Sequence, residues 1–263
     1  MGNDFKGLPR LENLPGSIAL RAGSKGIPRT RIFGMLALRS ALSFSLLLLL
    51  AYVFYLAGEK DPVTISAAWW LWFITVTNLV CLFLLYRFSQ LEGLKLSDIF
   101  YLNRSTWKGD LRWTLIAFLG MAPLALPPGI LLAQALWGDP LYPNTLLIQP
   151  VPKAAVYPLF LLMPVSQALA ELPVYWGYVA PRLRALGLNR VVVILVVGSV
   201  LSLQHMFFSF QPDWKYCLWL AVKFFPFALW TGFIVDRRPT ALPYLMGLHF
   251  LMDATLPYLV LIA

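Results

Sequence analysis

The strongest constraint on this 263-residue chain is a series of seven apolar stretches, each close to the length of a membrane span. A transmembrane helix needs roughly 20 predominantly apolar residues. The chain is 59% apolar and only 13% charged, which excludes a soluble globular domain. We therefore expect an all-α, polytopic transmembrane helix bundle of seven spans, or eight if Pro127 and Pro128 divide the third. The stretches occupy residues 33–56, 65–86, 113–137, 156–181, 191–210, 216–235 and 241–263.

The distribution of Lys and Arg predicts how the bundle is oriented. Residues 1–32 form a basic, Gly- and Pro-rich tail without the apolar core of a cleavable signal peptide, so residues 33–263 are expected to be one membrane domain anchored by its first span. The tail and every second loop hold sixteen Lys and Arg, whereas the other loops hold three. Because cytoplasmic loops carry the positive excess, we expect a cytoplasmic N terminus, a C terminus on the opposite side, and residence in the cell membrane. The net charge of +9 then faces anionic membrane lipids, and no nucleic-acid partner is expected.

Four ionisable side chains lie well inside the predicted spans. Glu171 is in the fourth span, His205 in the fifth, and His249 and Asp253 in the seventh. Ionisable groups are costly in a bilayer and usually functional. At a rise of about 1.5 Å per residue, all four fall in the middle third of the membrane. Three helices are thus expected to deliver them to one level, which is how sites in helix bundles are built.

Two further charges, Arg39 and Lys223, also lie inside predicted spans. Long basic side chains near a span end can bury their stems and keep the charged group in water. Both residues are close enough to a span end that we expect each to extend to the membrane interface.

Prolines predict interruptions in two spans. Pro173 disfavours helical geometry at Leu172 and removes a backbone hydrogen bond close to Glu171. Interrupted backbone at membrane depth is tolerated where protein or a water-filled cavity covers it, so we expect a cavity beside Glu171. Residues 127–129, with the sequence Pro-Pro-Gly, are expected to interrupt the third span in the same way.

The four ionisable side chains have the chemistry of a water-activating hydrolase. A carboxylate and an imidazole that face each other can hold a water, and the carboxylate can take its proton as the water attacks a carbonyl group. Glu171 and His205 fit these roles. His249 and Asp253, four residues apart, project from one helix face and could donate hydrogen bonds to a developing oxyanion. No metal or cofactor is expected, since the two cysteines of the chain form no metal motif.

Three short motifs in the last four spans resemble those of the CPBP (CAAX protease and bacteriocin-processing, or ABI) family. Residues 171–183, ELPVYWGYVAPRL, resemble its first motif, Glu-Glu-x-x-x-Arg, which usually continues Gly-Tyr-x-x-Pro-Arg-Leu. Residues 201–205, LSLQH, are similar to the second motif, Phe-x-x-x-His, and residues 249–253, HFLMD, to the third, His-x-x-x-Asn. The resemblance covers about residues 156–263.

That family consists of helical membrane bundles and includes the type II CAAX prenyl endopeptidases. The resemblance implies a metal-independent intramembrane endopeptidase that acts on a peptide or a lipid-modified peptide. It implies that Glu171 is the general base and that His205 helps to position the water. It places His249 and Asp253 at the oxyanion.

The chain departs from the family pattern at four positions. A glutamate and an arginine of the first motif are absent together, so we expect that a supporting ion pair has been lost as a unit, which avoids leaving one buried charge unpaired. The residues at the departing positions are Leu172 for Glu, Trp176 for Arg, Leu201 for Phe and Asp253 for Asn.

Three other functions remain open from the sequence. The same bundle without catalysis would be a membrane scaffold, a chaperone or an immunity protein for a peptide. Glu171, His205 and His249 are residue types of a catalytic zinc site, although the chain has no His-Glu-x-x-His motif. A buried Glu and His could also relay protons in a transporter, although no internal repeat favours one.

Overall fold

The structure, a computed structural model, describes residues 28–101 and 103–263, and within these ranges it contains helices and no strand. Seven helical segments are long and apolar enough to cross a membrane. This confirms the all-α, polytopic bundle, with one segment for each predicted span. Most of the tail predicted at residues 1–32 lies outside the described residues. The segments are Arg29–Leu56, Trp70–Leu91, Leu96–Trp137, Lys153–Ala185, Arg190–Phe208, Trp214–Arg237 and Pro239–Ile262.

Several segments contain more than one helix, because turns or changes of helix type divide them. Among these elements η2 is a π-helix, whereas η1 and η3 are short 3-10 helices. In chain order the elements are α2 (Arg29–Leu56), α3 (Pro62–Ala67), α4 (Trp70–Leu91), α5 (Leu96–Ile99), η1 (Arg104–Thr106), α6 (Trp107–Trp137), α7 (Tyr142–Leu147), α8 (Lys153–Val156), α9 (Leu159–Leu172), η2 (Pro173–Val179), α10 (Ala180–Ala185), α11 (Arg190–Phe208), α12 (Trp214–Lys223), α13 (Phe225–Arg237), η3 (Pro239–Ala241), α14 (Leu242–Asp253) and α15 (Leu256–Ile262).

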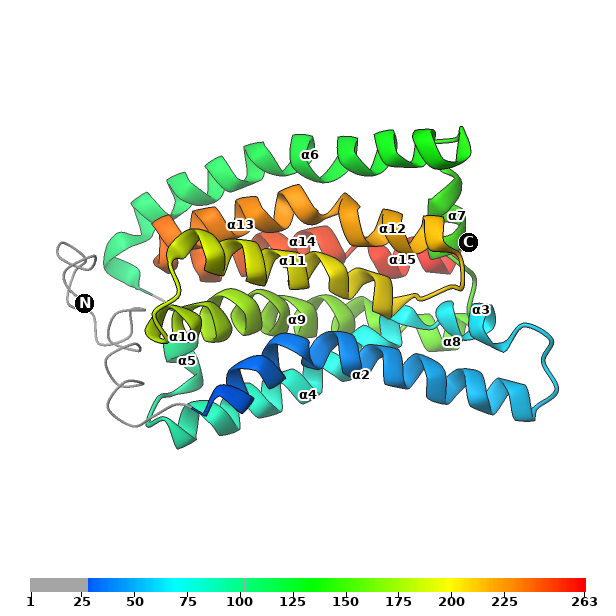
Figure 1. The fold of residues 1–263 in the computed structure, drawn as a ribbon, viewed down its shortest axis with the longest axis horizontal. Coiled ribbons are helices and arrows are strands. Elements are labelled where there is room, and N and C mark those ends of the chain that lie inside the picture. Colours follow the sequence, from blue (N-terminus) through cyan, green and yellow to red (C-terminus); the bar gives the residue numbers. More distant parts are fainter. Residues whose placement is uncertain (1–27, 102) are drawn as a thin grey trace.

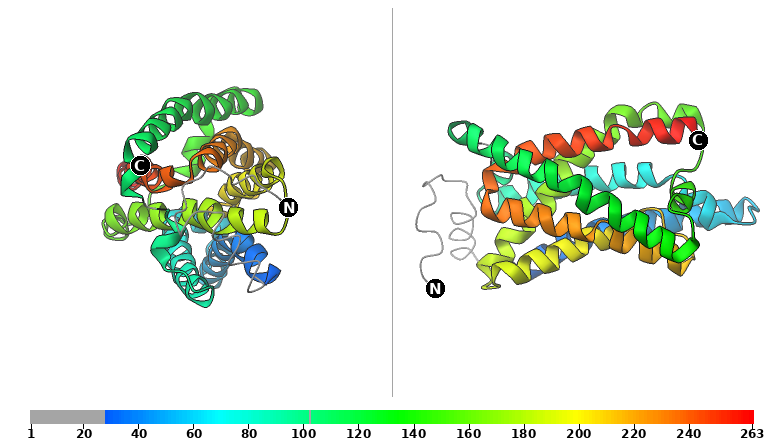
Figure 2. Two further views of the ribbon diagram at one scale, coloured as in Figure 1. Left: turned by 90° about the vertical axis from the view of Figure 1, so that its left-hand side faces the viewer. Right: turned by 90° about the horizontal axis from the view of Figure 1, so that it is seen from above.

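The long helices run side by side along the longest axis of the molecule (Figure 1). The helix formed by α9, η2 and α10 lies in the middle of the bundle, with α2 and α4 on one side and α11 to α13 on the other (Figures 1 and 2). α14 packs directly against α9, and α6 packs at the outer edge against α12 and α13. The start of α2 and the C terminus lie at opposite ends, as an odd number of spans requires.

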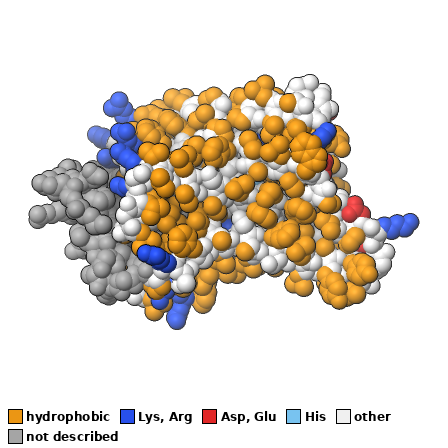
Figure 3. Space-filling model, viewed as in Figure 1, with side chains coloured by type: hydrophobic (Ala, Val, Ile, Leu, Met, Phe, Trp, Pro, Cys, Tyr) orange, Lys and Arg blue, Asp and Glu red, His pale blue; other side chains and the backbone are white. Residues whose placement is uncertain are grey.

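The sides of the bundle are apolar, and charged side chains gather at its ends. Figure 3 shows apolar side chains over the middle of the surface and a concentration of Lys and Arg at the end where α2 begins. Large apolar side chains remain exposed on the outer helix faces, among them Leu49, Phe83 and Leu131. Such an apolar belt fits contact with the hydrocarbon core of a bilayer.

The part of the third segment that is predicted to span the membrane lies within one uninterrupted helix, α6, which corrects the break expected at residues 127–129. α6 continues as an α-helix through Pro127 and Pro128. Prolines are tolerated inside membrane helices where neighbouring helices support the backbone. Here the indole N–H of Trp219 in α12 donates to the carbonyl oxygen of Gly129 at 2.9 Å. The described residues accordingly contain seven candidate spans and no eighth.

The fourth span also remains helical past Pro173 but changes helix type. Leu172 keeps right-handed helical angles, φ −61° and ψ −40°, so the expectation of non-helical geometry at this residue is wrong. The chain instead forms the π-helix η2, all of whose residues are buried. Dense packing overrides the local preference before proline, and the wider π turn accommodates the missing N–H. Tyr101 donates to the carbonyl oxygen of Gly177 within η2 at 2.9 Å.

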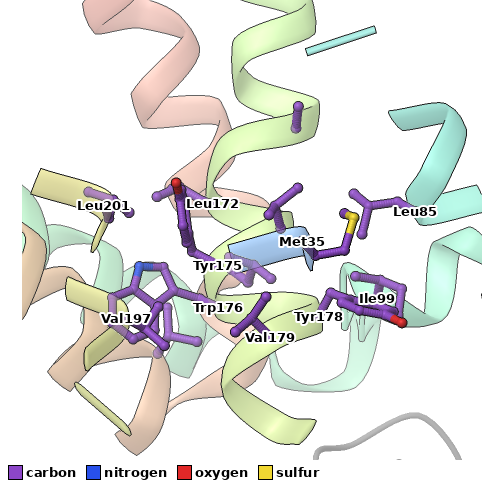
Figure 4. Packing of buried hydrophobic residues seen from close by; sticks show 14 of the residues in the cluster. Met35, Leu85, Ile99, Leu172, Tyr175, Trp176, Tyr178, Val179, Val197 and Leu201 are labelled. Carbon is purple, nitrogen blue, oxygen red and sulfur yellow. The ribbon is translucent and has the colours of Figure 1, made fainter. Parts of the chain in front are cut away.

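The largest buried apolar cluster surrounds η2 (Figure 4). Within η2, Tyr175, Trp176, Tyr178 and Val179 are at most 2% exposed. The core of the bundle is therefore packed around the helix that carries Glu171, which fixes the position of that residue. Side chains from other elements complete the cluster, among them Met35, Leu85, Ile99, Leu172, Val197 and Leu201.

Candidate active site

Glu171, near the end of α9, lies at the centre of a buried hydrogen-bond network. Its side chain is 2% exposed. Oε2 accepts from the amide of Gln167, and it lies 3.5 Å from Nη2 of Arg39 and 3.3 Å from Nε2 of His249. Oε1 accepts from the amide of Gln204 at 2.7 Å. Because a carboxylate oxygen accepts about two hydrogen bonds, Oε1 retains one accepting position.

Arg39 of α2 supplies the positive charge at this site, which corrects the expectation that it extends to the interface. Its side chain is completely buried. Besides facing Glu171, it donates to Gln204 at 2.7 Å, to Gln167 at 3.0 Å and to Asn78. A guanidinium presents its N–H groups in a fixed plane, so one side chain can join acceptors from several helices. The packing of α2 turns Arg39 inward, where these partners compensate the buried charge.

Three buried amides belong to this network, although a search for ionisable residues does not predict them. They are Asn78 of α4, Gln167 of α9 and Gln204 of α11. Asn78 donates to the side-chain oxygen of Gln167 at 2.9 Å. The hydroxyl of Tyr175 donates to the side-chain oxygen of Gln204, also at 2.9 Å. The signal in the sequence is a set of amides inside apolar stretches, with Gln167 one helical turn before Glu171.

His249 and Asp253 lie beside Glu171, as their predicted depth requires. Nε2 of His249 is 3.3 Å from Oε2 of Glu171 and 3.3 Å from Oδ2 of Asp253. Nε2 of His249 carries at most one proton, so it can donate one hydrogen bond, and the hydrogen-bond geometry directs this bond to Glu171. Oδ2 of Asp253 is buried and has no hydrogen-bond partner among the described residues.

His205 belongs to the same cavity but is held by different neighbours. Its Nδ1 lies 3.1 Å from the carbonyl oxygen of Ser202, and its ring lies against that of Phe224, tilted by 37° with a centroid separation of 4.2 Å. A carbonyl oxygen can only accept, so Nδ1 carries a proton in this contact. In the neutral ring, Nε2 then keeps a lone pair that can accept a hydrogen bond from water.

All four predicted site residues line one cavity of about 680 Å³, and the cavity expected beside Glu171 is confirmed. Its walls are mostly apolar and come from α4, from α9, from α11 to α15 and from the segment that contains α7. Leu141 and Ala263 also line it. The cavity therefore extends from the centre of the bundle toward the end where α7 and the C terminus lie (Figure 1).

Lys223, at the end of α12, also lines this cavity, so the expectation that it extends to the interface is wrong. The residue is 7% exposed. Its Nζ lies 3.6 Å from the ring centroid of Trp219 and 4.6 Å from that of Phe224. These two rings attract the ammonium group and keep it on the cavity wall, so the side chain does not extend along the helix to the membrane interface.

Three of the departures from the CPBP pattern fall in the apolar core of the bundle. Leu172, Trp176 and Leu201 belong to the buried cluster around η2 (Figure 4). Trp176 packs against Gly232 of α13, where an added Cβ would clash with the indole ring. Apolar side chains at these positions therefore suit their surroundings. The cation beside Glu171 comes instead from Arg39, which lies outside the CPBP-like region.

The described part of the chain does not bring together a set of metal ligands. Within residues 28–101 and 103–263, no group of three or more His, Cys, Asp and Glu side chains is arranged to hold a metal ion. His205, one of the ligands of the alternative zinc site, instead makes its hydrogen bond with Ser202. The fold and the site together define an integral membrane protein of the all-α class, with a buried Glu–Arg–His cluster at the head of an apolar cavity.

Comparison with known proteins adds no relative: no protein-family model, no curated protein and no solved structure matches this chain.

Proposed function

We propose that this protein is a metal-independent intramembrane endopeptidase in which Glu171 activates water. The observation that carries the proposal is that Glu171, His205, His249 and Asp253, from three spans, line one cavity. Histidine and carboxylate side chains are groups that can act as general acids and bases in hydrolysis. The resemblance of residues 171–183, 201–205 and 249–253 to the CPBP motifs supports the same assignment.

In the proposed reaction, a water hydrogen-bonds to the free accepting position on Oε1 of Glu171. Nε2 of His205 accepts the other water hydrogen and orients the oxygen. The water oxygen attacks the peptide carbonyl carbon while Glu171 takes its proton, and His249 and Asp253 stabilise the oxyanion. The carbon–nitrogen bond then breaks, and the proton held by Glu171 passes to the leaving amine.

The surroundings of Glu171 keep the carboxylate ionised, which is the form that a general base requires. Arg39 compensates its charge, and the amides of Gln167 and Gln204 fix its orientation. Donors that are already in place around a reacting group need no reorganisation during the reaction. Three of the four donor contacts fall on Oε2, which leaves Oε1 as the oxygen that receives the water.

The shape and lining of the cavity support an apolar peptide or a lipid-modified peptide as the substrate. Most of its lining is apolar, and it holds about 680 Å³, enough for several side chains or part of a lipid chain. We further propose residence in the cell membrane with a cytoplasmic N terminus, because Lys and Arg are concentrated at that end (Figure 3). The cavity then extends toward the opposite side of the membrane.

One observation favours a second candidate, a peptide-binding membrane protein without catalysis. Glu171 already receives contacts from four protein side chains, which is also what a purely structural buried carboxylate requires. In that case the same cavity would bind peptides and leave them intact. A hydrolysis measurement separates the two functions.

The test is mass spectrometry of a pool of apolar peptides, with and without lipid modification, incubated with proteoliposomes in heavy-oxygen water. An endopeptidase yields new C-terminal carboxylates that carry heavy oxygen, and a chelator does not suppress them. Empty liposomes prepared in parallel yield none. Peptides that bind the protein but stay intact would support the non-catalytic candidate, and loss of products with the chelator would point to a metalloenzyme.

A further inference from the structure

Lys223 is a charged residue on the cavity wall that has no acidic partner in the described part of the chain. The other charged groups at the cavity are matched, since Glu171 faces Arg39 and His249 faces Asp253. The His249 and Asp253 pair is neutral overall whether the proton lies on the imidazole or on the carboxyl group. No ion pair within the described ranges includes Lys223, and it contributes to no mechanistic step above.

The environment of Lys223 holds the ammonium group in place without neutralising it. Trp219 and Phe224 contact it with their rings, and Trp219 is itself fixed by its hydrogen bond to Gly129. A Cβ added at Gly129 would lie 3.3 Å from Cβ of Lys223, so the lysine stem packs against the backbone of α6. Aromatic rings attract a cation more weakly than a carboxylate does, and a buried cation is stabilised most by an anion.

We propose that Lys223 binds a carboxylate of the peptide that occupies the cavity, so that the site selects peptides that carry a negative charge. This inference rests on the proposed function only in taking a peptide as the occupant. The carboxylate belongs to an acidic side chain or to the C terminus of the peptide, because both present the same group to the ammonium ion.

The depth of Lys223 favours a peptide over a lipid headgroup. At about 1.5 Å per residue, Lys223 lies about 14 Å from the start of α12 at Trp214, which is close to the middle of a bilayer core. A phosphate headgroup would have to leave the interface to reach it. Leu141, Glu171 and Lys223 line the same cavity, so a peptide that extends along it from Leu141 toward Glu171 shares the cavity with Lys223.

The experiment measures binding of four labelled versions of one apolar peptide to the full-length protein in nanodiscs of neutral phosphatidylcholine. The versions carry Glu or Gln at a central position and a free or amidated C terminus. We expect the versions that carry the recognised carboxylate to bind about ten-fold more tightly than the version with neither charge, the usual effect of a charge-assisted hydrogen bond. Lys223→Met should remove this preference and Lys223→Arg should keep it. Lys215→Met, at the outer end of the same helix, is the matched control and should also keep it.

The change that abolishes the preference, either Glu to Gln or amidation of the C terminus, identifies the source of the carboxylate. Equal binding of charged and neutral peptides, no binding of any version, or a preference that survives in Lys223→Met would overturn the inference. Lys223-dependent binding of a labelled anionic lipid in place of the peptides would also overturn it. Cleavage products are assayed in the same samples. A Lys223-dependent preference without cleavage would refute only the proposed endopeptidase, and cleavage without preference would refute only the carboxylate subsite.

Discussion

Arg39 and Glu171, 132 residues apart in the sequence, face each other in the buried centre of the bundle, with Nη2 of the arginine 3.5 Å from Oε2 of the glutamate. The pair joins the first span to the helix that lies in the middle of the molecule. It also gives the proposed catalytic carboxylate a positive partner that does not come from the CPBP-like region. We therefore expect the stability of the fold and the proposed chemistry of the site to depend on the same two side chains.

Replacing Arg39 with methionine should destabilise the protein strongly. The substitution leaves the carboxylate of Glu171 buried without its cation, and breaking a buried ion pair on one side costs about 3–5 kcal/mol. The double variant Arg39→Met/Glu171→Gln should recover part of this loss, because no buried charge then remains unpaired. The free energy of unfolding in detergent micelles measures both effects. Arg29→Met, at an exposed position, is the control, and an equal loss in Arg29→Met and Arg39→Met would contradict the pairing.

Gly232→Ala should loosen the packing of α13 against η2. The added Cβ would clash with the ring of Trp176, and overpacking of this kind costs about 1–3 kcal/mol. Trp176→Phe in the same chain should restore part of the stability. Gly247→Ala is the matched control, since nothing lies within 4 Å of its Cβ position, and there alanine should stabilise the helix by up to about 1 kcal/mol. Thermal unfolding that affects both glycine variants alike would argue against this contact.

Asp253→Asn should retain at least the wild-type rate of hydrolysis and extend activity to higher pH. Oδ2 of Asp253 is buried without a donor, so the position suits a protonated acid, and an amide donates a hydrogen bond at any pH. The wild-type acid stops donating once it is ionised. If Asp253 instead holds His249 as a charged donor, the asparagine variant will be much less active. A rate far below wild type across the whole measurable pH range would contradict the protonated acid and support this second role of Asp253.

The proposed orientation predicts which single cysteines an impermeant thiol reagent reaches in intact cells. With Cys81 and Cys217 replaced by alanine, a cysteine at Glu59 or Asp139 should be labelled from outside. A cysteine at Arg87 or Arg190 should be labelled only after the membrane is made permeable. All four positions are exposed, so burial does not limit labelling. The opposite pattern would reverse the assignment of the two sides.

The number of spans and the fold class could be predicted from the sequence because apolar length alone determines them. The interruptions predicted from the prolines are wrong. Leu172 stays helical because dense packing around η2 outweighs the local preference of proline. Residues 127–129 interrupt nothing, although α6 lies at the outer edge of the bundle. The third span begins at Trp107, six residues before the apolar stretch, because its first turns are polar but still helical.

The site was predictable to the extent that ionisable residues inside spans mark it. Glu171, His249 and Asp253 do lie together, and His205 shares their cavity. Arg39 was misassigned because a sequence gives the depth of a residue in a span but not the direction in which it points. Buried amides such as Gln204 were missed for the same reason, since an amide in an apolar run can face either lipid or another helix.

The most direct test of the account is the initial rate of peptide hydrolysis by Glu171→Gln in proteoliposomes. The amide keeps the shape of the side chain but cannot take a proton from water, so we expect a fall of at least about 100-fold. Because this change leaves Arg39 unpaired, the variant Arg39→Met/Glu171→Gln is measured beside it as a second carboxylate-free protein, and Glu59→Gln serves as an exposed control that should retain full activity. Hydrolysis at the wild-type rate by either folded protein lacking the Glu171 carboxylate would contradict the account.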